Sequence, residues 1–233
     1  MKTLKDKVAV ITGGNDGIGK EIALKLAAQG VKLALVARNE KKLNQTKDEI
    51  GSDSTKIYSC DINVPNKRKD IVSKIISDFG QIDILINNAG IIHALRPLEE
   101  FDEEEIDSVI TTNLISLIQI TRLVLPHIKK QTEGAIINIS SVAGVRYKKG
   151  QSVYAASKWG VRGFSGVLKE DLKDTNVRVS CVCQGGVDTK LFEKAGDNRD
   201  TTDFIQPEDL ADVIVFMLSR PDHCWVHEVH VEK

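Results

Sequence analysis

The fold of this chain can be inferred from one stretch near its N-terminus, Val8-Ala9-Val10-Ile11-Thr12-Gly13-Gly14-Asn15-Asp16-Gly17-Ile18-Gly19. An apolar run leads directly into a glycine-rich turn, and apolar residues then recur at helical spacing until Gly30. This order predicts a buried strand, a tight turn and a helix. The glycines would let the backbone approach a pyrophosphate, whose charge the N–H groups at the start of the helix would meet.

The same glycines must be distinguished from the phosphate-binding loop of proteins that bind nucleoside triphosphates. Residues 14–20 satisfy the first seven positions of that loop. The eighth position is Glu21, whereas the loop needs a Ser or Thr hydroxyl there for magnesium. A carboxylate is a poor substitute for that hydroxyl, so we reject a nucleoside triphosphatase.

Further along the chain, strand-like and helix-like segments alternate. Apolar runs at 32–37, 57–60 and 82–86 predict strands, and helices are expected from about residue 40 and across 70–79. A further strand is expected at 177–183 and a further helix from about Pro207. Such alternation predicts an α/β fold with a parallel sheet, right-handed crossovers and helices on both faces.

Polar residues stand where three of these strands end. Asp61 follows the third strand, Asn87 and Asn88 follow the fourth, and Ser140 and Ser141 follow the fifth. Ligands of open parallel sheets bind at the carboxyl ends of the strands. These residues are therefore candidates for a binding site, although the two asparagines could also be simple turn residues.

Composition limits the classes of protein to which the chain can belong. With 233 residues, 41% hydrophobic content and a net charge of -1, it can form a single domain over residues 1–233. Basic residues are interleaved with acidic ones, so no nucleic-acid partner is expected. No apolar run approaches the ~20 residues that span a bilayer, and the N-terminus lacks the apolar core of a signal peptide. We therefore expect a cytoplasmic protein without membrane contact.

The cysteines and histidines do not predict a metal site. Cys181 and Cys183 lie two apart on an expected strand, which is a poor geometry for a disulfide. We expect all four cysteines to be buried as small apolar side chains. His227 and His230 are three apart in an alternating run, which would direct them to opposite faces of a strand and away from a shared metal.

A pair of residues with a chemical use lies in Tyr154-Ala155-Ala156-Ser157-Lys158. In a helix, positions i and i+4 place the phenol and the ammonium on one face. A cation that stabilises the phenolate by roughly 3 kcal/mol would lower the pKa of the tyrosine from its usual ~10 toward useful acidity. Tyr154 could then donate a proton to a carbonyl or accept one from an alcohol. Taken alone, the pair also fits an ordinary amphipathic helix with an exposed lysine.

In order and spacing, these motifs resemble those of the short-chain dehydrogenase/reductase family over about residues 5–190. The matching motifs are Thr12 to Gly19, Asn87-Asn88-Ala89-Gly90, Asn113, Ser141 and Tyr154-x-x-x-Lys158. The resemblance implies an oxidoreductase with a doubly wound Rossmann fold and a parallel sheet of about seven strands. The cofactor contacts that it implies are Gly13, Asn15, Asp16, Gly17, Ile18, Gly19, Arg38, Asp61, Ile62, Asn87, Ala89, Gly90, Tyr154, Lys158, Val187 and Thr189.

The resemblance also implies four catalytic residues. Ser141 would hydrogen-bond the substrate oxygen, and Tyr154 would transfer the proton. Lys158 would hold the nicotinamide ribose and lower the pKa of the tyrosine, while Asn113 would sustain a water-linked proton path to Lys158. Without the other motifs, Asn113 could equally be a helix cap or a satisfied polar residue in a buried helix.

The chain departs from the family pattern in two places. Gln184 stands where relatives usually have proline, a change expected to loosen the turn that presents Val187 and Thr189 to the nicotinamide. The segment 190–206, which would cover the substrate, is short and mostly polar. A cover of this length is not expected to enclose a steroid or a long acyl chain by itself.

The substrate and the function class stay partly open. The basic cluster Arg146-Tyr147-Lys148-Lys149 lies in the segment that faces substrate in relatives. It favours a small polar or anionic oxo/hydroxy compound or a β-ketoacyl group, although solvated surface charge would also explain it. A non-catalytic dinucleotide-binding sensor or scaffold is the alternative, since a fold does not fix function. A non-redox relative such as an epimerase is a third possibility.

The second strand ends in Ala37-Arg38, where an enzyme that prefers NAD would place an acid for the ribose hydroxyls. A guanidinium at this position can bind a 2′-phosphate, so NADP (NADPH) is favoured over NAD. Asp16 argues against this preference, because NADP-preferring relatives often carry a base there. The helix at about 103–130 and the helix of Tyr154 form the dimer bundle in relatives, so a homodimer or homotetramer is expected.

Overall fold

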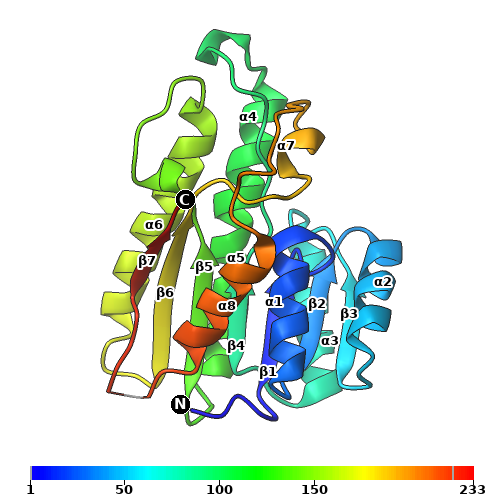
Figure 1. Ribbon diagram of the computed structural model, residues 1–233. Helices are drawn as coiled ribbons and strands as arrows, with labels where there is room; N and C mark the ends of the chain where they lie inside the picture. Colours follow the sequence, from blue (N-terminus) through cyan, green and yellow to red (C-terminus); the bar gives the residue numbers. More distant parts are fainter. Residues whose placement is uncertain (1, 222) are drawn as a thin grey trace.

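The computed structural model describes residues 2–221 and 223–233 and contains one seven-stranded sheet (Figure 1). All strand pairs are parallel, and the spatial order is β3-β2-β1-β4-β5-β6-β7. The strand order reverses between β1 and β4, as in doubly wound Rossmann folds. The predicted fold class is therefore confirmed. The strands are β1 (Val8–Thr12), β2 (Lys32–Ala37), β3 (Thr55–Ser59), β4 (Ile84–Asn87), β5 (Gly134–Ile139), β6 (Val177–Gln184) and β7 (Glu228–Val231).

Helices cover both faces of the sheet (Figure 1). On one face, α1, α2 and α8 share an apolar core that includes Leu26 and Ile214. On the other, α3, α5 and α6 share a second core that includes Ile75 and Val124. The helices are α1 (Gly17–Ala28), α2 (Glu40–Ile50), α3 (Pro65–Phe79), α4 (Glu103–Ile110), α5 (Ser116–Ile128), α6 (Ser152–Asp171), α7 (Leu191–Lys194) and α8 (Pro207–Leu218).

The boundaries of the elements differ from the sequence-based expectations at a few places. The helix expected over 70–79 already begins at Pro65, because proline fits the first turn of a helix, where its missing N–H costs no hydrogen bond. The strand expected at 82–86 is shifted to Ile84–Asn87. Central strands are buried along their whole length, so no alternation in the sequence marks where each one starts.

The helix predicted over 103–130 is interrupted by a π-helical segment, Thr111–Ile115, between α4 and α5. By length and composition alone, Glu103–Ile128 could cross a membrane, and 39% of its most apolar window is buried. This corrects the expectation that no stretch of the chain comes near that limit. A core helix of a globular domain passes the same test, and Val109, Ile120 and Val124 are fully buried here.

One of the four cysteines also differs from expectation. Cys60, Cys181 and Cys183 are buried, as predicted, whereas Cys224 is exposed. All four are free thiols. Cys181 and Cys183 lie on β6 with their sulfur atoms 4.0 Å apart, a hydrogen-bonding distance well beyond a disulfide bond.

Candidate active site

The glycine-rich turn between β1 and α1 needs its glycines. Gly13 and Gly17 have φ angles of +68° and +48°, in the left-handed region that glycine adopts without strain. Gly19 has no room for a side chain, because a Cβ there would lie 2.2 Å from the carbonyl oxygen of Gly13. The turn therefore packs tightly onto the first turn of α1, whose cap is the Asp16 carboxylate accepting from the Gly17 N–H at 3.0 Å.

Asn88 holds this turn from the end of β4. Its side-chain amide donates to the carbonyl oxygens of Thr12 at 3.1 Å and Gly13 at 3.3 Å. In return, the Thr12 hydroxyl accepts from the backbone N–H groups of Asn88 and Ala89, both at 3.1 Å. The sequence predicts Asn88 only as a candidate for the binding site or as a turn residue, without these hydrogen bonds. Alternation along the strand could have shown that Asn87 and Asn88 face opposite sides.

Asn87 lies on the other side of the strand, in a buried network. Its amide nitrogen donates to Thr121 at 2.9 Å and to Asn138 at 2.8 Å, and its side-chain oxygen is buried without a partner. Contact of the Asn87 side chain with a cofactor stays a prediction. The two hydrogen bonds donated by the Asn87 amide join β4 to α5 and to β5.

Tyr154 and Lys158 lie one turn apart on α6, with the ammonium nitrogen 5.7 Å from the centre of the phenol ring. The ammonium donates to the Ile139 carbonyl oxygen at 3.0 Å, at the end of β5. Both residues are almost completely buried, with 9% and 5% of their surface exposed. Ser141 follows directly after β5 and hydrogen-bonds the Tyr154 side chain.

The protein groups alone do not make Tyr154 acidic. Burial raises its pKa to about 12, and the hydrogen bond with Ser141 offsets only part of that rise. Burial likewise lowers the pKa of Lys158 to about 8, and Cys181 and Cys183 nearby oppose this change. Burial is the largest cause of the raised pKa of Tyr154, and Ser141 opposes it. That Lys158 lowers the pKa of Tyr154 stays a prediction.

Asn113 lies in the π-helical segment, buried next to the catalytic helix. Its amide nitrogen donates to the Ile91 carbonyl oxygen at 2.9 Å and to Ser157 at 3.0 Å, and its side-chain oxygen accepts from the Ile91 N–H at 2.8 Å. A Cβ on Gly90 would lie 3.3 Å from that oxygen and 3.5 Å from the Lys158 ammonium. Asn113, Gly90 and Lys158 are thus brought together, and π-helical segments are frequent at functional sites.

Other predicted site residues meet in one cavity of about 410 Å³ at the carboxyl ends of the strands. Ser141 and Tyr154 line it opposite the turn that follows β6. Thr189 also approaches the glycine turn, since a Cβ on Gly17 would lie 2.9 Å from its methyl group. The predicted residues that line this cavity are Ile18, Ser141, Tyr154, Val187 and Thr189.

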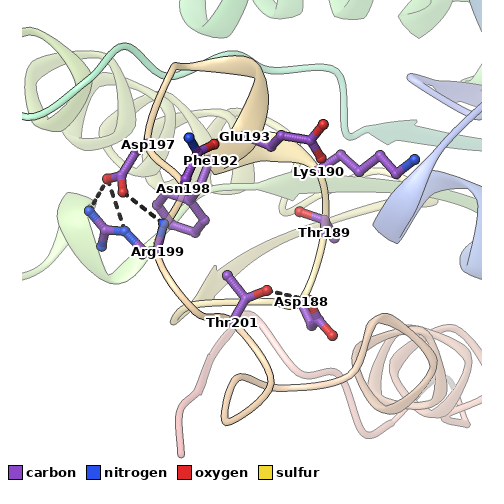
Figure 2. Close-up of a pocket in the computed structure, with 9 residues that line it drawn as sticks. All are labelled: Asp188, Thr189, Lys190, Phe192, Glu193, Asp197, Asn198, Arg199 and Thr201. Carbon is purple, nitrogen blue, oxygen red and sulfur yellow. Dashed lines mark hydrogen bonds and ion pairs between the residues drawn. The ribbon is translucent and has the colours of Figure 1, made fainter.

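The segment after Thr189 forms its own cavity of about 460 Å³ (Figure 2). Arg199 forms an ion pair with Asp197, and Thr201 donates to Asp188, so that the segment closes on itself. Phe192 and Arg199 line both this cavity and the one that contains Tyr154. The short polar segment predicted to cover the substrate thus lies beside Tyr154.

Asp16 is more than a helix cap. Its second oxygen forms ion pairs with Lys42 at 2.7 Å and with Lys194 at 2.9 Å. Burial favours the protonated acid, but hydrogen bonds from these two lysines outweigh it and lower the pKa of Asp16 to about 2. The sequence did not predict either partner, because they are 26 and 178 residues away.

Three of the predicted cofactor residues that do not line the cavity of Tyr154 follow the ends of β2 and β3. Arg38 is exposed, and its carbonyl oxygen accepts from Ser59 on the neighbouring strand. Asp61 accepts from the Asn63 N–H in a tight turn, and Ile62 is buried. Both strands lie on the same side of β1 in the sheet order, with β2 next to β1, whereas Asn15 lies within the glycine turn.

The basic cluster after Ser141 is partly neutralised. Arg146 forms two hydrogen bonds with Glu232, at 2.7 and 2.8 Å. Tyr147 is exposed and stacks on Trp159. Lys148 alone of the cluster lines the catalytic cavity.

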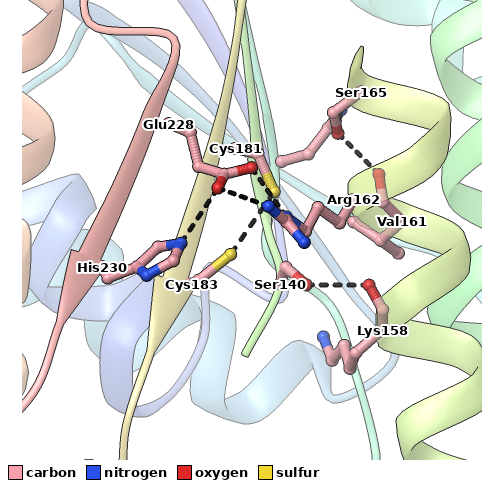
Figure 3. A network of polar contacts seen from close by, with 10 residues as sticks. Ser140, Lys158, Val161, Arg162, Ser165, Cys181, Cys183, Glu228 and His230 are labelled. Carbon is pink, nitrogen blue, oxygen red and sulfur yellow. Dashed lines mark hydrogen bonds and ion pairs between the residues drawn. The ribbon is translucent and has the colours of Figure 1, made fainter. Parts of the chain in front are cut away.

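Cys183, Glu228 and His230 form a group whose possible ligand atoms lie within 4.8 Å of one another (Figure 3). From the sequence, His230 is paired only with His227, and Cys183 and Glu228 are not predicted beside it. Both oxygens of Glu228 accept from the Arg162 guanidinium, at 2.9 and 3.0 Å. A hydrogen bond with Cys181, together with burial, raises the pKa of the Cys183 thiol, which opposes the thiolate that a metal needs. The group is thus arranged as an ion-pair network, and the absence of a metal stays a prediction.

Comparison with known proteins agrees with this geometry. The family model described as short chain dehydrogenase matches residues 7–200. An uncharacterized oxidoreductase of Staphylococcus epidermidis is 34% identical over 231 residues, 99% of each chain, and one of Staphylococcus aureus is 32% identical over the same length and coverage.

Solved structures are similar over nearly the whole chain. Serine dehydrogenase complexed with NADP+ superposes with a TM-score of 0.89 at 29% identity, covering 97% of this chain and 94% of that one. A metagenomic short-chain oxidoreductase in complex with NADP gives a TM-score of 0.87 at 31% identity, covering 99% and 98%. The chain belongs to the short-chain dehydrogenase family and is an oxidoreductase.

Proposed function

We propose that the protein interconverts a carbonyl and a secondary alcohol with NADP(H), and that Tyr154 donates and accepts the proton. The observation that carries this proposal is the joint position of Tyr154 and Ser141 on one cavity, with the Lys158 ammonium behind the tyrosine ring. The hydroxyl of Tyr154 keeps its proton at neutral pH, since its pKa is raised to about 12. The neutral Tyr154 hydroxyl can therefore donate this proton to the substrate oxygen during carbonyl reduction.

The glycine turn fits a nicotinamide dinucleotide. The backbone at Gly13, Gly17 and Gly19 leaves no space for side chains, and the turn leads into the N-terminus of α1, which favours a phosphate group. When bound, the nicotinamide supplies or accepts the hydride. The turn at Val187 and Thr189 would hold its carboxamide, and Asp61 with Ile62 would contact the adenine.

Each catalytic side chain has a distinct role in this proposal. Ser141 hydrogen-bonds the substrate oxygen and orients it toward Tyr154. Lys158, whose pKa is lowered to about 8, can exchange a proton near neutral pH and can hold the ribose. Asn113 keeps the π-helical segment against Ser157 on α6 and so positions a proton path to Lys158.

Preference for NADP(H) rests on the charges around the ribose end of the site. Arg38 is exposed at the end of β2, and the charge of Asp16 is balanced by Lys42 and Lys194. The negative charge of Asp16, which was expected to disfavour NADP, is thus neutralised by two lysines of the protein. We expect a higher kcat/KM with NADPH than with NADH. Arg38→Ala should lower the NADPH value about tenfold and leave the NADH value nearly unchanged.

Several side chains favour a small polar or anionic oxo/hydroxy compound or a β-ketoacyl group as substrate. The cavity is only about 410 Å³ in volume, and Lys148, Arg199 and Lys233 line it together with the two acids Asp203 and Glu232. Serine dehydrogenase, one of the similar structures, acts by its name on a small hydroxy acid. Because Arg146 is paired with Glu232, Lys148→Ala is the sharper test: it should reduce selectivity for carboxylate-bearing over neutral ketones.

A cofactor-binding sensor or scaffold is the competing function. NADPH oxidation by the wild-type protein, measured with a panel of small ketones, ketoacids and β-ketoesters, separates the two. Turnover supports the enzyme, whereas tight NADPH binding without turnover on any of these compounds supports the sensor.

Exposed apolar side chains on two helices favour a homo-oligomer. Ile115, at the end of the π-helical segment, and Val167 on α6 are large apolar side chains with 43% and 63% of their surface exposed. They lie on the two helices that form the dimer bundle in the family, so we propose a homodimer or homotetramer in the cytoplasm. Light scattering at micromolar concentration tests the assembly, and a strictly monomeric species would contradict it.

A further inference from the structure

Gln184 lies beside Ser141 on the neighbouring strand. It is the last residue of β6, and the register pairs Ile139 of β5 with Val182 of β6. Ser141 keeps an extended backbone, with φ -159° and ψ 161°. Continuing the register by two residues brings Ser141 opposite Gln184, at the strand spacing of about 5 Å and on the same face of the sheet.

The amide of Gln184 is buried and incompletely satisfied. Only 7% of the residue is exposed, and its side-chain oxygen is buried without a hydrogen-bond partner. The residue lines the same cavity as Ser141 and Tyr154. A buried acceptor without a donor costs free energy, and a ligand that donates a hydrogen bond to this oxygen would recover that cost.

We propose that Gln184 is a specificity-determining residue whose amide oxygen accepts a hydrogen bond from a hydroxyl or amino group on the carbon next to the reacting carbonyl. The preferred substrates are then α-hydroxy or α-amino carbonyl compounds and the alcohols derived from them. Ser141 hydrogen-bonds the reacting oxygen, and the Gln184 amide hydrogen-bonds the hydroxyl or amino group on the next carbon. This inference rests on the proposed function, because it takes the reacting oxygen to lie at Ser141 and Tyr154.

The strength of such discrimination follows from the burial of the amide. A site built to hydrogen-bond a substrate hydroxyl rejects the analogue that lacks it, because the buried protein group is then left unpaired. A plain ketone would leave the Gln184 oxygen as it is now, without a donor. Replacing the amide with an apolar side chain of similar size removes this penalty and should remove the preference.

The test compares 3-hydroxy-2-butanone with 2-butanone, which differ by one hydroxyl next to the carbonyl. The quantity measured is the ratio of their kcat/KM values with NADPH, because comparing this ratio between variants cancels the different intrinsic reactivity of the two ketones. Wild type should show a ratio about tenfold higher than Gln184→Met and Gln184→Leu. Two variants are used because either one alone could fold poorly. Gln206→Leu is the control, since the exposed Gln206 lies outside the cavity and should keep the wild-type ratio.

A binding measurement separates failure of this inference from failure of the proposed function. Saturation-transfer NMR gives dissociation constants for both ketones with the cofactor-free protein, in which neither ketone can be reduced and the hydroxyl of 3-hydroxy-2-butanone cannot be oxidised. The same tenfold difference between wild type and the variants supports the inference, even if no ketone is turned over and the proposed function fails. An equal ratio in wild type and both variants overturns it. Weaker NADPH binding by the variants with an unchanged ketone ratio also overturns it, because the amide would then serve the cofactor.

Discussion

Asn88, at the end of β4, donates its side-chain amide to the carbonyl oxygens of Thr12 and Gly13, at 3.1 and 3.3 Å. The glycine turn is thereby tied to the neighbouring strand before any ligand binds. Asn88→Ala should lower the free energy of unfolding by about 1–3 kcal/mol and weaken NADPH binding about tenfold, since two hydrogen bonds are lost.

Urea denaturation and fluorescence titration with NADPH measure both effects. Asn44→Ala is a suitable control, because Asn44 is an exposed helix residue that bonds only the Glu40 carbonyl oxygen four residues away. Unchanged NADPH affinity in Asn88→Ala would contradict the role assigned to this residue.

The tight packing of Gly19 provides a second prediction. A methyl group at this position would lie 2.2 Å from the Gly13 carbonyl oxygen, so Gly19→Ala must displace the turn that holds the pyrophosphate. We expect NADPH affinity to fall at least tenfold. Gly163→Ala, on the open surface of α6, should keep full affinity and gain up to about 1 kcal/mol of stability from its helix propensity. Equal affinities of the two variants would refute the argument.

The ion pairs of Asp16 predict a pH-dependent contribution to stability. The pKa of Asp16 is about 2 in the folded protein against an ordinary value of 3.8, so its stabilising effect is complete above that value and is lost as the pH falls toward 2. Asp16→Asn can still cap α1, and it should cost about 0.5–1 kcal/mol at pH 7 because the group is partly exposed. The difference from wild type should shrink below pH 4, and a difference that persists there would contradict the assignment.

The burial of Lys158 also predicts that stability rises with pH, but in an alkaline range. Its pKa is about 8 in the folded protein against an ordinary value of 10.5, so the cost of burying the charge is greatest below pH 8 and disappears above 10.5. Lys158→Met should therefore be inactive yet at least as stable as wild type at pH 6.5. Wild type should gain stability relative to this variant between pH 8 and 10.5. A constant difference across this range in thermal unfolding would show that the ammonium is not buried at a cost.

The sequence predicted those parts of the site that depend on local pattern. The strand, glycine turn and helix follow from Val8 to Gly19, and the Tyr154–Lys158 spacing follows from helical geometry. The ion pair between Asp16 and Lys194 could not be predicted, because it depends on how the segment after β6 folds back over the glycine turn. The raised pKa of Tyr154 also depends on burial, which a local motif does not specify.

The position of Gln184 next to Ser141 likewise could not be predicted from a local sequence pattern. The sequence marked it as a departure from the family's proline and predicted only a looser turn. Its register beside Ser141 and its unpartnered amide oxygen become apparent once β5 and β6 are paired. A residue that breaks a family pattern can therefore carry specificity that the pattern itself does not reveal.

The central claim is that Tyr154 transfers the proton during carbonyl reduction. It is tested most directly by kcat/KM for NADPH-dependent ketone reduction in wild type and Tyr154→Phe, with the NADPH dissociation constant measured for both. We expect a loss of at least 10²-fold in kcat/KM, with NADPH affinity changed less than about threefold, since only the hydroxyl is removed. Turnover by Tyr154→Phe at a rate similar to that of wild type would contradict it.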